Sequence, residues 1–162
     1  MPILTSPLDL IYLKGEKRSL LGLDVGDKVI GLSLSDILWY VATPYTNIQR
    51  KNFKTDRKEL KIFIEKHSIA ALVVGLPLNM NGTEGPRVQS TKQFVRNFLD
   101  YHDIPVCFWD ERLSTSAVER MMIDADLSRQ KREKRVDQLA ASFILQGVLD
   151  MVQHHLKLHS NG

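Results

Sequence analysis

Apolar and polar residues along this chain follow two periods, and the switches between them predict the order of its elements. Short apolar segments bounded by turn residues predict strands at 19–25, 28–35, 41–49, 70–75 and 104–110. Apolar residues at helical spacing predict helices at 55–67, 88–101 and 134–156. Thr55 is the expected cap of the first helix, and Ser116 with Glu119 has the capping-box spacing that starts one more. The predicted order is βββαβαβαα.

The connections predict how these strands pair. Gly26-Asp27 is typical of a tight hairpin, so the first two strands are expected to be antiparallel, and Pro44 favours an edge position for the third. The later strands return through helices and are expected to be parallel. The predicted fold class is α/β, with a mixed five-stranded sheet of three antiparallel and then two parallel strands, flanked by helices. We expect an extension at 1–18, a single domain at 19–157 and a polar tail at 158–162.

Length and composition support one globular domain. A chain of 162 residues with 43% apolar residues can bury a full core without disulfides. The one cysteine, Cys107, has apolar neighbours and is expected to be a buried thiol in a reducing compartment. The first residues lack a signal-peptide pattern, and no run approaches the ~20 apolar residues of a membrane span. We therefore expect a cytoplasmic protein with no membrane partner.

The net charge of +3 favours a nucleic-acid partner only weakly. Its distribution says more, because Lys and Arg concentrate in residues 50–66 and 128–135. The simpler interpretation is that both runs are solvated helix faces.

Candidate chemistry comes from carboxylates that lie far apart in the chain. Asp24 follows the first strand, Asp110 and Glu111 end the last strand, and Asp137 opens the final helix near its apolar face. Each has a structural interpretation: a turn at Gly26 for Asp24, a local ion pair with the next residue for Glu111, and helix-dipole stabilisation for Asp137. Together they could converge at one sheet edge, where Mg²⁺ would offset their repulsion and two such ions could support phosphodiester hydrolysis.

Other chemistries lack a pattern. The histidines have no Cys/His spacing for zinc, and those at 154, 155 and 159 are expected in a polar tail. No Walker loop, dinucleotide G-x-G-x-x-G or G-x-S-x-G serine motif occurs.

Four ordered blocks in this chain resemble the signature blocks of the YqgF (RuvX-type) family. They read GLDVGDKVIGLSLSD, VVGLPLNMNGTEGPR, DERLST and VDQLAASFILQ, within about residues 20–152. The resemblance implies a ribonuclease-H-like fold. It also implies a nuclease dependent on Mg²⁺ or Mn²⁺ that acts on the 5′ end of pre-16S rRNA, with ribosomal particles as partners, or on Holliday junctions.

The resemblance also implies roles for individual residues. Asp24, Glu111 and Asp137 would be catalytic metal ligands, with Asp110 as a fourth carboxylate. Gly26 and Gly31 would keep the backbone clear near phosphate, or serve simply as hairpin glycines. Contacts with nucleic acid would come from the loop that includes Gly82 and from basic or polar residues, which are Lys28, Asn79, Arg87, Arg112, Lys131, Arg132, Lys134 and Arg135.

Two positions depart from the family pattern, Val29, where a basic residue is usual, and Ser114, where Thr is common. Neither is a proposed ligand, but Val29 weakens the expectation of a phosphate contact. Three alternatives stay open: a DNA junction resolvase, a ribosome-assembly factor that binds RNA without cutting it, and an actin-like nucleotide-binding domain, for which 162 residues are too few. Monomer and homodimer also stay open.

Overall fold

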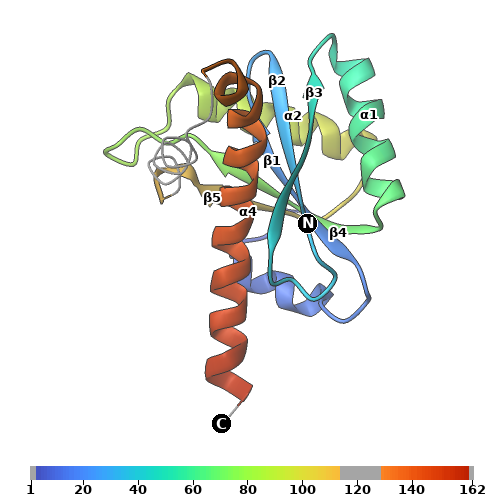
Figure 1. The fold of residues 1–162 in the computed structure, drawn as a ribbon, viewed down its shortest axis with the longest axis vertical. Helices are drawn as coiled ribbons and strands as arrows, with labels where there is room; N and C mark the ends of the chain where they lie inside the picture. Colours follow the sequence, from blue (N-terminus) through green and yellow to red (C-terminus); the bar gives the residue numbers. More distant parts are fainter. Residues whose placement is uncertain (1–2, 114–128, 161–162) are drawn as a thin grey trace.

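The computed structural model describes residues 3–113 and 129–160, which form a mixed five-stranded sheet with helices on both faces (Figure 1). The strand order is β3-β2-β1-β4-β5. β1 pairs antiparallel with β2, and β2 with β3, whereas β4 is parallel to both β1 and β5. The elements are η1 (Pro7–Leu13), β1 (Ser19–Val25), β2 (Val29–Ser35), β3 (Ala42–Gln49), α1 (Phe53–Lys66), β4 (Ile69–Leu76), α2 (Pro86–Tyr101), β5 (Val106–Asp110), η2 (Glu111–Leu113) and α4 (Arg129–Ser160). The predicted fold class is confirmed.

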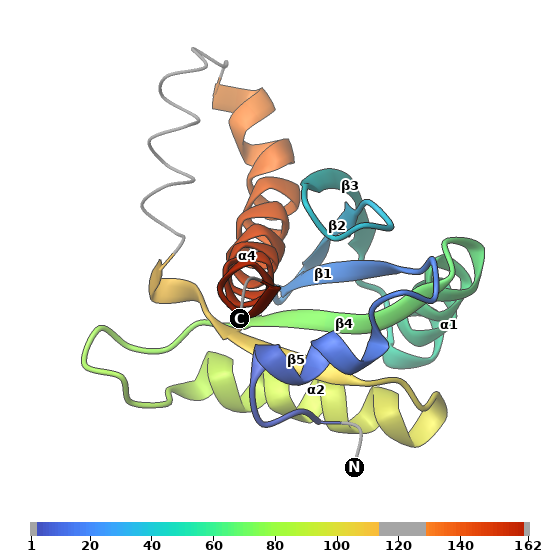
Figure 2. The ribbon, with the colours of Figure 1, turned by 90° about the horizontal axis from the view of Figure 1, so that it is seen from below.

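Residues of β1, β4 and β5 contribute to two separate cores, one on each face of the sheet. In β1, Leu21 and Leu23 pack into the core on the side of α1 and α2, while Leu20 packs on the side of α4. Figure 2 shows α2 and α4 on opposite sides of the sheet. Because strand side chains alternate between faces, Asp24 lies on the α4 side.

The β1–β2 hairpin is as tight as its sequence predicts. The Gly26 amide donates a hydrogen bond to the Val29 carbonyl at 2.9 Å. A Cβ on Gly26 would lie 2.7 Å from that same carbonyl oxygen, so this turn requires glycine. The third strand is at the sheet edge as expected, and Pro44 lies next to an irregularity in its register with β2.

Two expectations need correction, and the N-terminal extension adds a finding. Helix α1 begins at Phe53 and is capped by Asn52, whose side chain accepts from the Thr55 amide, so Thr55 is not the cap. The final helix starts at Arg129 instead of 134, because its basic first turns carry no apolar period to mark them. The extension at 1–18 is packed: the Leu4 amide donates to Val106 at 2.8 Å, and η1 buries Leu10.

Three further expectations concern a helix, membrane spans and the cysteine. The helix expected from Ser116 and Glu119 lies outside the described residues. None of the helices in the described ranges is long and apolar enough to cross a membrane. The predicted burial of Cys107 is confirmed, and burial raises the pKa of its thiol to about 12.

Candidate active site

Asp24 lies near the carboxyl end of β1 with only 9% of its surface exposed. It is paired in register with Gly31 of β2, so no neighbouring side chain on that strand covers it. A buried carboxylate is costly unless it is protonated or paired. Burial accordingly raises the pKa of Asp24, while a hydrogen bond with Glu111 and the charge of Arg87 lower it in part.

Glu111 follows β5 and brings its side chain across β4 toward Asp24. A Cβ on Gly75 of β4 would lie 2.7 Å from Cγ and 3.0 Å from Cδ of Glu111, so the carboxyl group occupies the space that this glycine leaves. Burial, followed by the charge and hydrogen bond of Asp24, raises the pKa of Glu111 to about 8. The two carboxyls share a hydrogen bond, which requires that one of them carry a proton.

Asp137 reaches the same place from α4. A Cβ on Gly31 would lie 2.0 Å from the Asp137 carbonyl oxygen and 2.9 Å from its Cβ, so the helix rests directly on the β2 backbone. Burial and then the charge of Asp24 raise the pKa of Asp137. Because Asp137 lies more than two turns after Arg129, the helix dipole, which acts within the first turn, does not explain this carboxylate.

Arg87 supplies the opposite charge. It lies in the first turn of α2, is exposed, and lowers the pKa of Asp24, Glu111 and Asp137 alike. The sequence suggested only a nucleic-acid contact for this residue. In the structure its charge acts on every carboxylate of the cluster.

Asp110 is held by Arg112, and the charge of Asp110 contributes to the raised pKa of the neighbouring Glu111. Arg112 binds Asp110 through its backbone amide at 3.0 Å and through its guanidinium at 2.6 Å and 3.0 Å. These hydrogen bonds hold the pKa of Asp110 below its ordinary value. The local ion pair considered for Glu111 is therefore made by its neighbour.

The loop between β4 and α2 is fastened to this ion pair and to itself. Arg112 donates to the Met80 carbonyl at 3.2 Å. The Asn79 side-chain amide donates to the Thr83 hydroxyl at 3.0 Å, and the Asn79 backbone carbonyl accepts from the Gly82 amide at 2.8 Å. Asn79 thus holds the loop's shape, and this loop ends where Arg87 begins α2.

The other predicted nucleic-acid contacts lie at the same end of the sheet. Lys28 is exposed in the β1–β2 turn. Figure 1 shows that turn, the start of α1 and the start of α4 at one end of the molecule. The first turns of α4 contain four predicted contacts whose side chains lie outside the described part of the chain: Lys131, Arg132, Lys134 and Arg135.

Asp24, Glu111 and Asp137 offer oxygen ligands of the kind that Mg²⁺ and Mn²⁺ prefer. Within the described residues, no three His, Cys, Asp or Glu side chains are already spaced as ligands of one ion. Burial raises the pKa of all three carboxyls, and the charge of Asp24 raises the pKa of Glu111 and of Asp137 further.

Two residues of this site were missed at the sequence level. Gly75 makes room for Glu111, and its position at the end of a buried apolar strand is the signal that could have found it. Arg50 donates to the Gly26 carbonyl at 2.8 Å and lies 3.6 Å from buried Asp56, so it fixes the turn that follows Asp24. Nothing in the local sequence distinguishes Arg50 from its basic neighbours.

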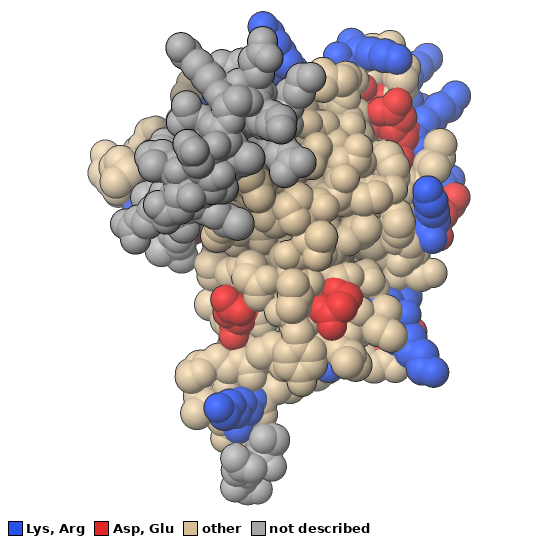
Figure 3. Space-filling model, in the orientation of Figure 1, with Lys and Arg blue, Asp and Glu red and all other residues tan. Residues whose placement is uncertain are grey.

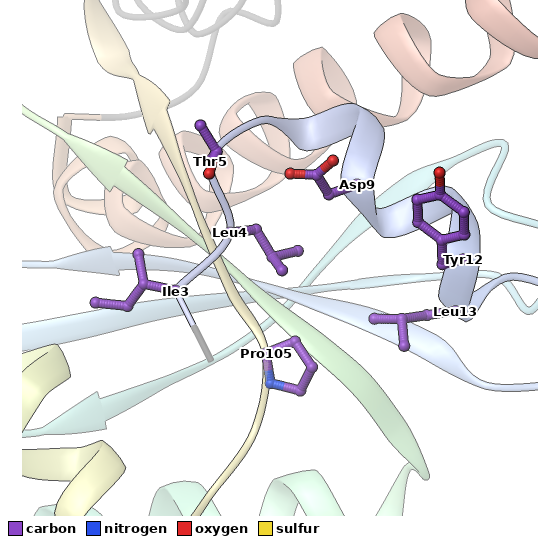
Figure 4. Close-up of a pocket in the computed structure, with 7 residues that line it drawn as sticks. All are labelled: Ile3, Leu4, Thr5, Asp9, Tyr12, Leu13 and Pro105. Atoms are coloured by element: carbon purple, nitrogen blue, oxygen red, sulfur yellow. The ribbon is translucent and has the colours of Figure 1, made fainter. Parts of the chain in front are cut away.

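The described residues also form a cavity of about 440 Å³, far from these carboxylates (Figure 4). It lies where the N-terminal segment meets the start of β5, at the opposite end of the sheet. Its lining is mostly apolar and consists of Ile3, Leu4, Thr5, Asp9, Tyr12, Leu13 and Pro105. No carboxylate of the cluster reaches it.

Comparison with known proteins gives concordant results. The model of a family described as "RuvX: Holliday junction resolvase" matches residues 18–151. Proteins named "Putative pre-16S rRNA nuclease" are similar along most of their length. The one from Paramagnetospirillum magneticum is 47% identical over 150 residues, covering 93% of this chain and 96% of the relative. The one from Rhizobium meliloti is 54% identical over 133 residues, covering 82% and 81%.

Two solved structures share the fold. RuvC of T. thermophilus in complex with a Holliday junction substrate aligns with a TM-score of 0.51 and 12% identity, over 86% of this chain and 96% of RuvC. The yeast mitochondrial Holliday junction resolvase Ydc2 aligns with a TM-score of 0.51 and 14% identity, over 95% of this chain and 87% of Ydc2. At such identities the likeness concerns the fold alone.

Proposed function

The chain belongs to the RuvX family, and we propose that it is a divalent-metal-dependent endonuclease that processes the 5′ end of pre-16S rRNA. The observation that carries this proposal is the convergence of Asp24, Glu111 and Asp137 from a strand, a strand end and a helix. Such a cluster lies beside the exposed Arg87 at one end of a sheet, and it suits hydrolysis of a phosphodiester better than any role in folding.

In this proposal Asp24, Glu111 and Asp137 hold Mg²⁺ or Mn²⁺. The ion, when bound, activates a water and stabilises the leaving oxygen of the phosphodiester. Because Asp24 and Glu111 share a hydrogen bond, a proton would have to leave this pair for both groups to serve as ligands. Asp110 lies outside this ligand set, because Arg112 already engages both of its oxygens.

Positively charged residues around the carboxylates hold the substrate. Arg87 is exposed and electrostatically coupled to all three acids, so it is placed to bind the phosphate next to the cut. Lys28 and the basic first turns of α4 would contact the backbone on either side. Arg112 acts indirectly, since it positions the loop at Met80 and the strand end at Asp110.

RNA is preferred over DNA because proteins about 50% identical to this chain carry a name that refers to pre-16S rRNA. A cytoplasmic location and an encounter with ribosomal particles are part of the same proposal. The second candidate function is Holliday junction resolution, which the family description and the fold of RuvC favour. Resolution would call for a homodimer, because two active sites must face two strands.

The test is cleavage of a pre-16S rRNA 5′-leader fragment and of a synthetic four-way DNA junction, side by side in Mn²⁺, by the wild-type protein and by Asp137→Asn. We expect cleavage of the RNA alone, lost in the variant and in EDTA. Cleavage of the junction alone would support the resolvase. If neither substrate is cut while RNA binding is tight and independent of metal, the protein is an assembly factor and not a nuclease.

A further inference from the structure

Four exposed lysines lie in the β1–β2 turn, just before α1 and in the first turns of α1, and three of them have no assigned role. We name this set the α1 ridge; its members are Lys28, Lys51, Lys54 and Lys58. Lys54 and Lys58 are one helical turn apart and therefore on the same face of α1. Figure 3 shows Lys and Arg gathered along the upper and right-hand edge, where α1 lies, while the broad surface over α4 and β3 carries few charges.

The ridge begins at the catalytic end of the sheet. The Arg50 amide donates to the Lys28 carbonyl at 2.8 Å, so the turn after Asp24 and the approach to α1 are joined by backbone. Arg50 also binds the Gly26 carbonyl and places its guanidinium 5.2 Å from the centre of the Phe94 ring on α2. The ridge is thus held at a fixed position relative to Asp24.

The lysines of the ridge are not used within the fold. Among the described residues, none of them takes part in an ion pair. The carboxylate of Asp56 is buried, forms an ion pair with Arg50 and accepts a hydrogen bond from the Lys51 amide. Asp27 and Glu59 are the remaining acids beside the ridge, so four lysines face two carboxylates and leave a net positive strip.

The aromatic residues near the ridge are not available for stacking on bases. Phe53 packs edge-on against Phe94, with 5.7 Å between ring centres. The Tyr101 ring is covered by Arg57, whose guanidinium lies 4.3 Å from its centre. Binding of single strands relies on open aromatic platforms, whereas duplexes are held mainly through phosphates.

We infer that the α1 ridge binds the phosphate backbone of a duplex arm that extends from the cut toward α1. The inference rests on the proposed function for its choice of nucleic acid, and it adds that the substrate is recognised as a duplex beside the scissile bond. The contacts are sequence-independent, so the ridge sets affinity and orientation and leaves the choice of bases to other groups.

The test measures binding of an RNA duplex to the full chain in EDTA, in an Asp24→Asn background that cannot cut. Lys54→Gln/Lys58→Gln is compared with Lys66→Gln/Lys157→Gln, which removes the same charge from exposed positions away from the ridge. Because each lost phosphate contact lowers the salt dependence, the slope of log K against log salt should fall by about 2 in the ridge variant. The duplex affinity at low salt should fall about tenfold, and the control should match the parent.

Two outcomes would overturn the inference: equal slopes for the ridge variant and the control, or an equal loss of affinity for single-stranded RNA of the same length. Thermal unfolding of both double variants checks that they are folded. The nuclease proposal is tested separately, by measuring cleavage with proteins in which Asp24 is unchanged. Cleavage with an unchanged KM in the ridge variant would reject the ridge alone, and a ridge effect on binding without any cleavage would reject only the nuclease.

Discussion

The two faces of the central sheet are built from alternate residues of the same strands, yet they differ in kind. Toward α1 and α2, β2 presents Ile30 and Leu32, both fully buried in a core of large side chains. Toward α4, it presents Gly31 and Ser33. The first face stabilises the fold by burying apolar surface. The second lets a helix approach closely enough to carry a carboxylate to Asp24.

The α4 face achieves this approach with small residues and specific hydrogen bonds. A Cβ on Gly22 would lie 2.8 Å from the Ala141 carbonyl oxygen, and the Ser33 hydroxyl donates to that same oxygen at 2.8 Å. Gln146 accepts from the Ala42 amide of β3 at 2.8 Å. The position of Asp137 therefore depends on glycines in strands far from it in the chain.

Outside the carboxylates themselves, the largest expected effect follows from adding one carbon atom to the α4 face. Gly31→Ala places a Cβ 2.0 Å from the Asp137 carbonyl oxygen, so α4 must shift. Since a displacement of about 1 Å can cost 10²-fold in rate, we expect kcat in Mn²⁺ to fall by about two orders of magnitude. The measurement is single-turnover cleavage of the RNA leader. A variant that cuts at the wild-type rate would show that α4 does not need this contact.

The neighbouring residue on the other face should behave in the opposite way. Leu32→Ala removes a fully buried side chain and should lower the free energy of unfolding by about 2–5 kcal/mol. The folded fraction should keep its Mn²⁺ affinity and cleavage rate at low temperature. Urea denaturation and cleavage at 10 °C measure the two quantities. If Leu32→Ala lowered the cleavage rate as much as Gly31→Ala, the two faces of the sheet would not differ in their effect on the site.

The shared proton predicts how stability depends on pH without metal. The pKa of Glu111 rises from an ordinary value near 4.5 to about 8, so between those values the folded state holds a proton that the unfolded state has lost. Stability is then fully present below about 4.5 and declines as pH rises toward 8, by at most about 1.4 kcal/mol per pH unit for one proton. Denaturation in EDTA at pH 5.5, 7 and 8.5 should show this decline.

The matched control for that decline is Glu111→Gln, which cannot titrate and should give a flatter profile. An unchanged slope in this variant would mean that other groups carry the dependence. Affinity for Mn²⁺ should move in the opposite direction in the wild type and rise with pH, because the ligands must lose their proton.

The smallest expected effect separates two adjacent carboxylates. Asp110→Asn should reduce cleavage by less than about tenfold, since Asp110 holds Arg112 and its effect on the site is indirect. Glu111→Gln should abolish cleavage under the same conditions. An equal loss of cleavage in the two variants would show that Asp110 is as important to the site as Glu111.

The alternation of residues along the strands explains which parts of the fold and of the site could be predicted from the sequence. It predicted all five strands, and it also contained the distinction between Asp110 and Glu111. Cys107 and Trp109 of β5 face α4 while Val106 and Phe108 face the other core, so Glu111 continues the α4 side. The expected convergence of Asp24, Glu111 and Asp137 followed from the same pattern.

Other features depend on contacts that no local pattern reveals. The first turns of α4 are basic and lack an apolar period, so the helix begins earlier than expected. Asn52 and Thr55 are both residue types that cap helices, and it is the Asn52 side chain that accepts from a backbone amide of the first turn. Arg50 joins the turn after Asp24 to α1 and α2, which are distant in sequence.

We propose that the glycine-lined face brings Asp24, Glu111 and Asp137 to one divalent ion. The most direct measurement is Mn²⁺ binding, followed by loss of the free-ion electron paramagnetic resonance signal at pH 8, for the wild type, Asp24→Asn and Asp137→Asn. We predict saturable binding by the wild type and a loss of affinity of at least about tenfold in each variant. Binding that is equal in all three proteins, or absent from the wild type at millimolar Mn²⁺, would contradict the account.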